Sequence, residues 1–172
     1  MSEVELLPGH VSPRGIGTIP LADLAQYGGL EVLRRLMEGQ YPAAPIAALM
    51  NLALTEVDPG RVVFRGMPGT AHLNPLGGVH GGWTATIMDS ALGCAVHTLL
   101  QPGEGYATAE FKVNLLRPIT PQTGEVACEG KVIHKGRTSA VSEARLTDAE
   151  GRLLAFGTET CAIFSLAGRA GG

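Results

Sequence analysis

The feature that most constrains this chain is a central apolar stretch that directly follows a glycine-rich loop. Residues 83–100 are apolar or small at nearly every position. A helix of that composition has no polar face, so the rest of the fold must enclose it. One carboxylate, Asp89, interrupts the stretch. Because burying an ionised side chain costs several kcal/mol unless partners compensate, Asp89 either has a structural partner or takes part in chemistry.

Length and charge narrow the class of protein. The chain has 172 residues, of which 45% are apolar and 17% charged, and its net charge is -3. This length fits one domain, and the low charged fraction indicates that other subunits cover part of the surface. The acidic balance argues against nucleic acid as the main partner, because phosphate binding needs clustered basic side chains. Without a basic leader or an apolar span of about 18 residues, we expect a cytoplasmic protein with no membrane partner.

The cysteines and histidines form no metal-binding pattern. Three cysteines are widely spaced and lack a CxxC pair, namely Cys94, Cys128 and Cys161. This arrangement is typical of reduced thiols packed in a core. Three histidines lack a helical spacing with a supporting carboxylate, namely His72, His80 and His97. We therefore expect no metal and no cofactor.

The N-terminal part of the chain alternates between irregular and helical patterns. Residues 1–20 are rich in Pro and Gly, which favours an irregular arm. Leucines at helical spacing predict a helix over residues 21–39, with a break at Gly28 and Gly29, and a short helix follows over residues 46–50.

The remaining pattern is that of strands joined by short turns. Residues 52–57 and 61–66 flank a Pro-Gly turn and predict a first hairpin. Four more strands are expected after the apolar helix, over residues 106–116, 125–134, 138–147 and 152–164. Strands on either side of one long helix predict an α+β fold in which an antiparallel sheet wraps that helix.

A motif at the start of the helix resembles that of a known family. Asn74 is followed after five residues by His80, Gly81 and Gly82, and after six more by Asp89. This pattern resembles the PaaI-type hotdog acyl-CoA thioesterases. The resemblance implies a hotdog fold and a homodimer with shared active sites, assembled as a dimer of dimers into a homotetramer.

The resemblance also divides the chain into parts. It extends over residues 46–164, which would form the thioesterase domain. Residues 1–45 would then be an N-terminal arm and helical extension, and residues 165–172 a flexible tail.

The resemblance implies hydrolysis of small or aromatic acyl-CoA thioesters to free acid and CoA. Asp89 would be nucleophile or general base, the Gly81 amide would polarise the thioester carbonyl, and Asn74 would position substrate or water. Physical chemistry agrees, because the first turn of a helix presents unpaired N–H groups at the positive end of its dipole. Gly81 and Gly82 can therefore donate to a developing oxyanion. The thiolate leaves without a strong acid to assist it.

Two further residues carry alternative interpretations. Thr108 matches the position where several family members place a hydroxyl beside the catalytic carboxylate, although threonine also favours strands for packing. His80 either contacts substrate or ties down the loop through its ring nitrogens.

A basic turn is the candidate for binding the CoA nucleotide. Its residues are Lys135, Gly136, Arg137 and Thr138. The resemblance places this turn near the nucleotide end of the CoA site, where two cations meet phosphates. The alternative is an exposed charged turn.

Three other interpretations remain open from the sequence. In the first, Asp89 is a buried structural acid bonded to the neighbouring loop. In the second, the chain is a hotdog dehydratase or hydratase, and in the third it is a non-catalytic acyl-CoA-binding protein. A dehydratase would need a histidine acid/base opposite a carboxylate.

The spacing of the motif predicts a site shared between chains. Gly81 and Asp89 are eight residues apart on one helix, which separates them by about 12 Å along the axis. One thioester carbonyl does not bridge that distance. If two helices pack antiparallel across a two-fold axis, Gly81 of one chain meets Asp89 of the other.

Overall fold

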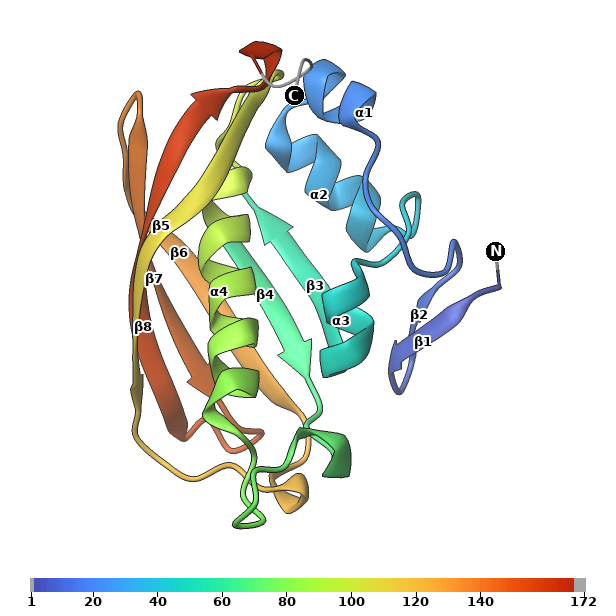
Figure 1. The fold of residues 1–172 in the computed structure, drawn as a ribbon, viewed down its shortest axis with the longest axis vertical. Coiled ribbons are helices and arrows are strands. Elements are labelled where there is room, and N and C mark those ends of the chain that lie inside the picture. Colours follow the sequence, from blue (N-terminus) through green and yellow to red (C-terminus); the bar gives the residue numbers. More distant parts are fainter. Residues whose placement is uncertain (1, 169–172) are drawn as a thin grey trace.

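The computed structural model describes residues 2–168 and shows an antiparallel sheet with a long helix packed on one face (Figure 1). The helix is α4 (Gly81–His97). The sheet strands are β3 (Leu52–Asp58), β4 (Arg61–Gly66), β5 (Glu104–Leu115), β6 (Val126–Lys135), β7 (Ser139–Thr147) and β8 (Leu153–Ser165). They are hydrogen-bonded in the order β3-β4-β6-β7-β8-β5, and each neighbouring pair is antiparallel. This arrangement confirms the predicted α+β hotdog fold.

The main core lies between α4 and the sheet. The buried side chains that α4 contributes to it are Trp83, Ile87, Met88, Ala91, Leu92 and Ala95. Gly130 on β6 lets the helix approach closely, because a Cβ built on it would lie 2.2 Å from the Ala91 carbonyl oxygen. A larger residue there would push α4 off the sheet.

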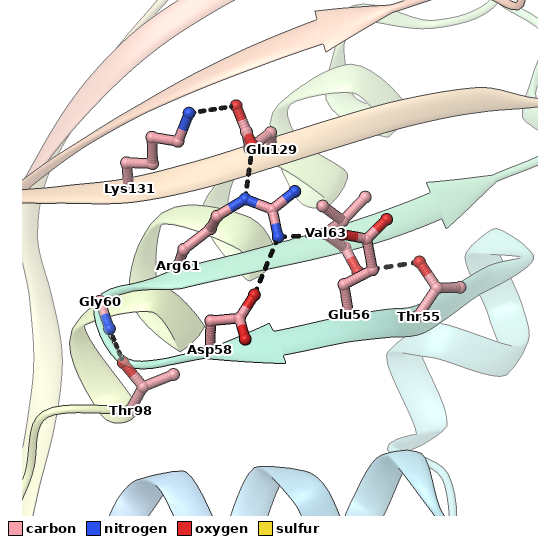
Figure 2. A network of polar contacts seen from close by, with 9 residues as sticks. All are labelled: Thr55, Glu56, Asp58, Gly60, Arg61, Val63, Thr98, Glu129 and Lys131. Atoms are coloured by element: carbon pink, nitrogen blue, oxygen red, sulfur yellow. Dashed lines mark hydrogen bonds and ion pairs between the residues drawn. The ribbon is translucent and has the colours of Figure 1, made fainter.

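A polar network fixes the end of the sheet where α4 terminates (Figure 2). Arg61 pairs with Glu56 at 2.9 Å, Asp58 at 3.1 Å and Glu129 at 2.6 Å. The Gly60 N–H donates to Thr98 Oγ1 at 2.7 Å, which joins the β3–β4 turn to the residue after α4. Such partly exposed ion pairs contribute about 0–1 kcal/mol each, so their main effect is to fix the turn in place.

The N-terminal arm was predicted to be irregular, and this prediction is wrong. β1 (Val4–Leu7) and β2 (His10–Ser12) pair as a small antiparallel sheet. Pro8 and Gly9, two of the residues that favoured an irregular arm, form the turn between them, where Gly9 has φ +79°. The hairpin packs near α3 and β3.

The helices predicted before the first strand of the sheet are confirmed. They are α1 (Leu21–Gln26), α2 (Gly29–Met37) and α3 (Pro45–Met50), with the break at the predicted glycine pair. Short 3-10 turns lie at Thr70–His72, Pro121–Thr123 and Leu166–Gly168. The last of these and the end of β8 occupy the start of the predicted tail, and residues 169–172 of that tail lie outside the described residues.

The two edges of the sheet differ. The β3 edge lies beside α2, α3 and β1. Within residues 2–168, β5 has a strand partner on one side alone, which is β8. Its residues 107–112 are exposed. An open strand of this length offers unpaired backbone groups to another strand.

Across the described chain, no helix combines the length and apolarity that a membrane crossing requires.

Candidate active site

The start of α4 presents backbone donors. His80 is the N-cap residue, and its ring Nδ1 accepts a hydrogen bond from the Gly82 N–H at 2.8 Å. The Gly81 N–H has no acceptor among residues 2–168. Because the first turn is the positive end of the helix dipole, Gly81 offers one oriented donor to an anion, whereas Gly82 already donates to His80.

The loop before α4 is organised by Asn74. Its Oδ1 accepts from the N–H groups of Leu76 at 2.8 Å and Gly78 at 3.3 Å. Its backbone N–H donates to the Gly78 carbonyl at 2.8 Å. Asn74 thus folds the loop with its oxygen, and its amide nitrogen has no hydrogen-bond partner among residues 2–168.

The middle of α4 carries the carboxylate. Asp89 is half-buried, and its Oδ1 accepts from Thr108 Oγ1 of β5 at 3.1 Å. Its Oδ2 has no hydrogen-bond partner within the described residues, and none of their cationic groups lies within ion-pair distance of it. One carboxylate oxygen is therefore held by a hydroxyl while the other is available to a substrate or a water.

A cavity of about 390 Å³ opens beside this carboxylate. Asp89 and Thr108 lie on its wall, and most of the remaining lining is apolar. Apolar lining residues from the N-terminal half include Leu6, Val11, Leu36, Met37, Ile46 and Phe64. The volume falls within the range of about 300–1,000 Å³ that is usual for small-molecule sites. The N-terminal extension therefore supplies part of the wall.

Two ionisable groups in the second half of α4 are neutral. Burial raises the pKa of the Cys94 thiol to about 12 and lowers the pKa of His97 to about 4. Cys94 is thus a thiol and not a thiolate nucleophile at neutral pH. The His97 ring is an uncharged neighbour of Tyr106, with ring centroids 5.5 Å apart.

The basic turn lies at the opposite end of α4 from Gly81. Lys135 Nζ is 3.6 Å from Glu104 Oε2, and Glu104 begins β5 just after α4 ends. Gly136 donates its N–H to Ser139 and the Thr138 carbonyl accepts from Ile163, so both support the hairpin. Arg137 is exposed and has no ion-pair partner in residues 2–168.

The predicted residues thus form three groups in one chain. Thr108 and Asp89 are in contact, as are His80 and Gly82, while the 135–138 turn lies apart from the helix start (Figure 1). Nowhere in the described residues do three or more His, Cys, Asp or Glu side chains cluster as metal ligands.

One polar residue of this region was missed by sequence reasoning. Glu159 on β8 is 0% exposed, and its Oε1 is 3.1 Å from Thr108 Oγ1. The sequence feature that points to Glu159 is its position in a strand, where it alternates with Gly157 and Cys161, which are buried on the same face.

Comparisons with known proteins agree with this geometry. Residues 76–155 match the sequence model of the thioesterase superfamily. Human acyl-coenzyme A thioesterase 13 is 30% identical over 114 residues, which are 65% of this chain and 79% of that one.

Two solved structures show the same fold. The E. coli PaaI protein from the phenylacetic acid degradation operon has a TM-score of 0.69 at 17% identity, over 83% of this chain and 96% of that one. A hypothetical thioesterase protein of Streptococcus pneumoniae, solved with coenzyme A, has a TM-score of 0.60 at 26% identity, over 66% and 86% of the two chains. Motif, fold and relatives together show that the chain belongs to the thioesterase superfamily, as its resemblance to PaaI-type enzymes predicted, and that it is a thioester hydrolase.

Proposed function

We propose that the protein hydrolyses acyl-CoA thioesters with small or aromatic acyl groups. The observation that carries this proposal is the Asp89 carboxylate on the wall of a largely apolar cavity, with one oxygen held by Thr108 and the other available. The acyl group occupies this cavity, where its burial contributes binding free energy. The thioester carbonyl then lies beside Asp89.

Asp89 acts as general base or nucleophile. As a base, it takes a proton from a water whose oxygen bonds to the carbonyl carbon; the C–S bond then breaks, and the CoA thiolate regains the proton. As a nucleophile, its oxygen bonds to the carbonyl carbon and displaces the thiolate, and water then hydrolyses the mixed anhydride. In both routes the Gly81 N–H of a helix start stabilises the oxyanion.

The donor and the carboxylate come from two chains in this proposal. Two copies pair through the open β5 edge, which aligns their helices antiparallel about a two-fold axis. Gly81 and Asn74 of one copy then meet Asp89 and Thr108 of the other. Two such dimers assemble into a tetramer, which sedimentation velocity would detect.

The same pairing gives the basic turn its function. Lys135 pairs with Glu104, which begins β5 just beyond the end of α4 opposite Gly81. Antiparallel pairing brings that end towards the helix start of the second copy. Lys135 and Arg137 then bind phosphates of the CoA nucleotide, while Gly136 and Thr138 shape the turn. The structure of the Streptococcus pneumoniae relative with coenzyme A supports this class of ligand.

A substrate panel with thiol detection tests the function. Acetyl-, hexanoyl-, benzoyl- and phenylacetyl-CoA should release free CoA and the matching acid, with the apolar acyl groups giving the higher kcat/KM. Crotonyl-CoA distinguishes a hydratase, which would add water to the double bond and release no thiol. Binding of acyl-CoA without any turnover would instead identify a non-catalytic acyl-CoA-binding protein.

A further inference from the structure

Two buried carboxyl groups in this chain have opposite surroundings. The Asp148 side chain is 1% exposed and contacts Arg152 Nε at 2.6 Å. Glu159 is 0% exposed, and no Lys, Arg or His nitrogen of the described residues lies within ion-pair distance of it. A buried carboxylate without a cation is far less stable than the neutral acid. The surroundings of Glu159 therefore favour its protonated form.

The hydrogen bonds around Thr108 require that one of its two carboxyl neighbours is protonated. Its Oγ1 lies 3.1 Å from both Asp89 Oδ1 and Glu159 Oε1, but a hydroxyl has one proton to donate. If both carboxyl groups were ionised, one of these oxygen pairs would have no proton between its atoms. If Glu159 is protonated, it donates to Thr108, and the Thr108 proton is then directed to Asp89.

A β-bulge in β5 keeps a third carboxylate away from this chain of hydrogen bonds. Thr108 is paired with Cys161, and in a regular ladder Glu110 would be paired with Glu159. The register instead shifts between Thr108 and Glu110, so that Phe111 is paired with Glu159. Because side chains alternate between faces, this one-residue shift places Glu110 on the other face of the strand.

The balance of the groups around Glu159 favours the same form. Burial raises its pKa, and the negative charges of Asp89 on α4 and Glu110 on β5 raise it further, while its contacts with Cys161 Sγ and Thr108 Oγ1 lower it. On β7 the paired residue is the uncharged Ser142. Burial also raises the pKa values of the nearby Cys94, Tyr106 and Cys161, which remain uncharged at neutral pH.

We propose that Glu159 is a positioning residue of the thioesterase site: as a neutral acid it donates to Thr108, which in turn donates to Asp89 Oδ1. The inference rests on the proposed function of Asp89. Its consequence is a carboxylate with a fixed orientation, in which Oδ2 faces the substrate.

Two substitutions at one position test this directly. Glu159→Gln keeps a donor, because its amide nitrogen can bond Thr108, and should retain most of kcat. Glu159→Leu removes the donor and should lower kcat by about 10- to 100-fold with little change in KM. Ser142→Ala, at the paired buried position on β7, is the control and should leave activity unchanged. Thermal unfolding confirms that each variant folds.

Two further readouts separate positioning from packing. In the wild type, kcat should fall as the pH rises through the folded-state pKa of Glu159, and Glu159→Gln should lack this decline. In a Thr108→Val background, Glu159→Leu should cause no further loss, because both changes break the same chain of hydrogen bonds. A Gln variant as impaired as the Leu variant, or losses that multiply, would overturn the inference.

An infrared difference spectrum of wild type against Glu159→Gln tests protonation without any substrate. A carboxylic-acid carbonyl band that disappears in the Gln variant supports the inference, and a carboxylate band overturns it. A wild-type protein that releases no thiol overturns the proposed function instead, so the two failures are distinguishable.

Discussion

The start and the middle of α4 are built on different principles. At the start, the groups available to a ligand are backbone N–H groups, ordered by the side chains of His80 and Asn74. In the middle, the available group is the side chain of Asp89, which is ordered by Thr108 from a neighbouring strand. The first region can stabilise negative charge and the second can supply an electron pair or accept a proton.

In the proposed dimer, this difference gives each chain half of two sites. The two regions are about 12 Å apart along the helix, yet thioester hydrolysis needs both functions within hydrogen-bond distance of one carbonyl. A two-fold pairing of antiparallel helices brings unlike regions together and creates two equivalent sites. Substitutions that impair one region or the other test this arrangement.

The largest effect is expected from Asp89→Asn. Removing the charge while preserving the shape should lower kcat by about 10²- to 10⁴-fold, because an amide is neither a base nor a nucleophile here. Binding of a CoA ligand should persist. Thr86→Ala, on the same helix with its hydroxyl bonded to the Gly82 carbonyl, is the matched control. Wild-type kcat in the Asn variant would remove Asp89 from the mechanism.

The second prediction tests whether the helix start of one chain and Asp89 of another form one site. Asp89→Ala protein and Asn74→Ala protein are each expected to be inactive, and their subunits are dissociated and reassembled together. A heterodimer then contains one site with both defects and one site with neither, so activity should return to about half of wild type per heterodimer. Verified heterodimers as inactive as their parents would show that both groups act within one chain.

The sequence was informative where local spacing determines position. The Asn-His-Gly-Gly-Asp motif located both the start and the middle of α4, because residues on one helix have fixed separations. The strand pattern gave the sheet, since alternating apolar residues and short turns are local features.

Long-range register was not accessible in the same way. Glu159 meets Thr108 because β8 and β5 pair across 51 residues, and a bulge in β5 keeps Glu110 off the face they share; a local pattern encodes neither. The hairpin of residues 4–12 was missed for a similar reason. Its strands are too short to show alternation, and its Pro-Gly turn suggested an irregular segment.

A third prediction concerns the nucleotide end of the proposed shared site. Lys135→Ala combined with Arg137→Ala should raise KM for acyl-CoA by about 5- to 30-fold with kcat nearly unchanged, if each cation contributes about 0.5–1 kcal/mol. Lys131→Ala combined with Arg145→Ala removes the same charge from exposed positions of the sheet and is the control. The effect should vanish for pantetheine thioesters. An equal rise in KM for both substrate types would exclude phosphate binding by this turn.

The smallest effect is expected at the helix start, where His80→Ala tests capping against substrate contact. Losing the N-cap bond to Gly82 should reduce the free energy of unfolding by about 1 kcal/mol and lower Tm by about 2–4 °C. His80→Asn should restore most of that stability, because Asn is a favourable N-cap residue. His134→Ala, at an exposed strand position, is the control. If capping is the whole role, kcat/KM of the Asn variant should match wild type. A variant that is stable but impaired in kcat would instead place the His80 ring against the substrate, and the start of α4 would then contribute a side chain to catalysis as its middle does.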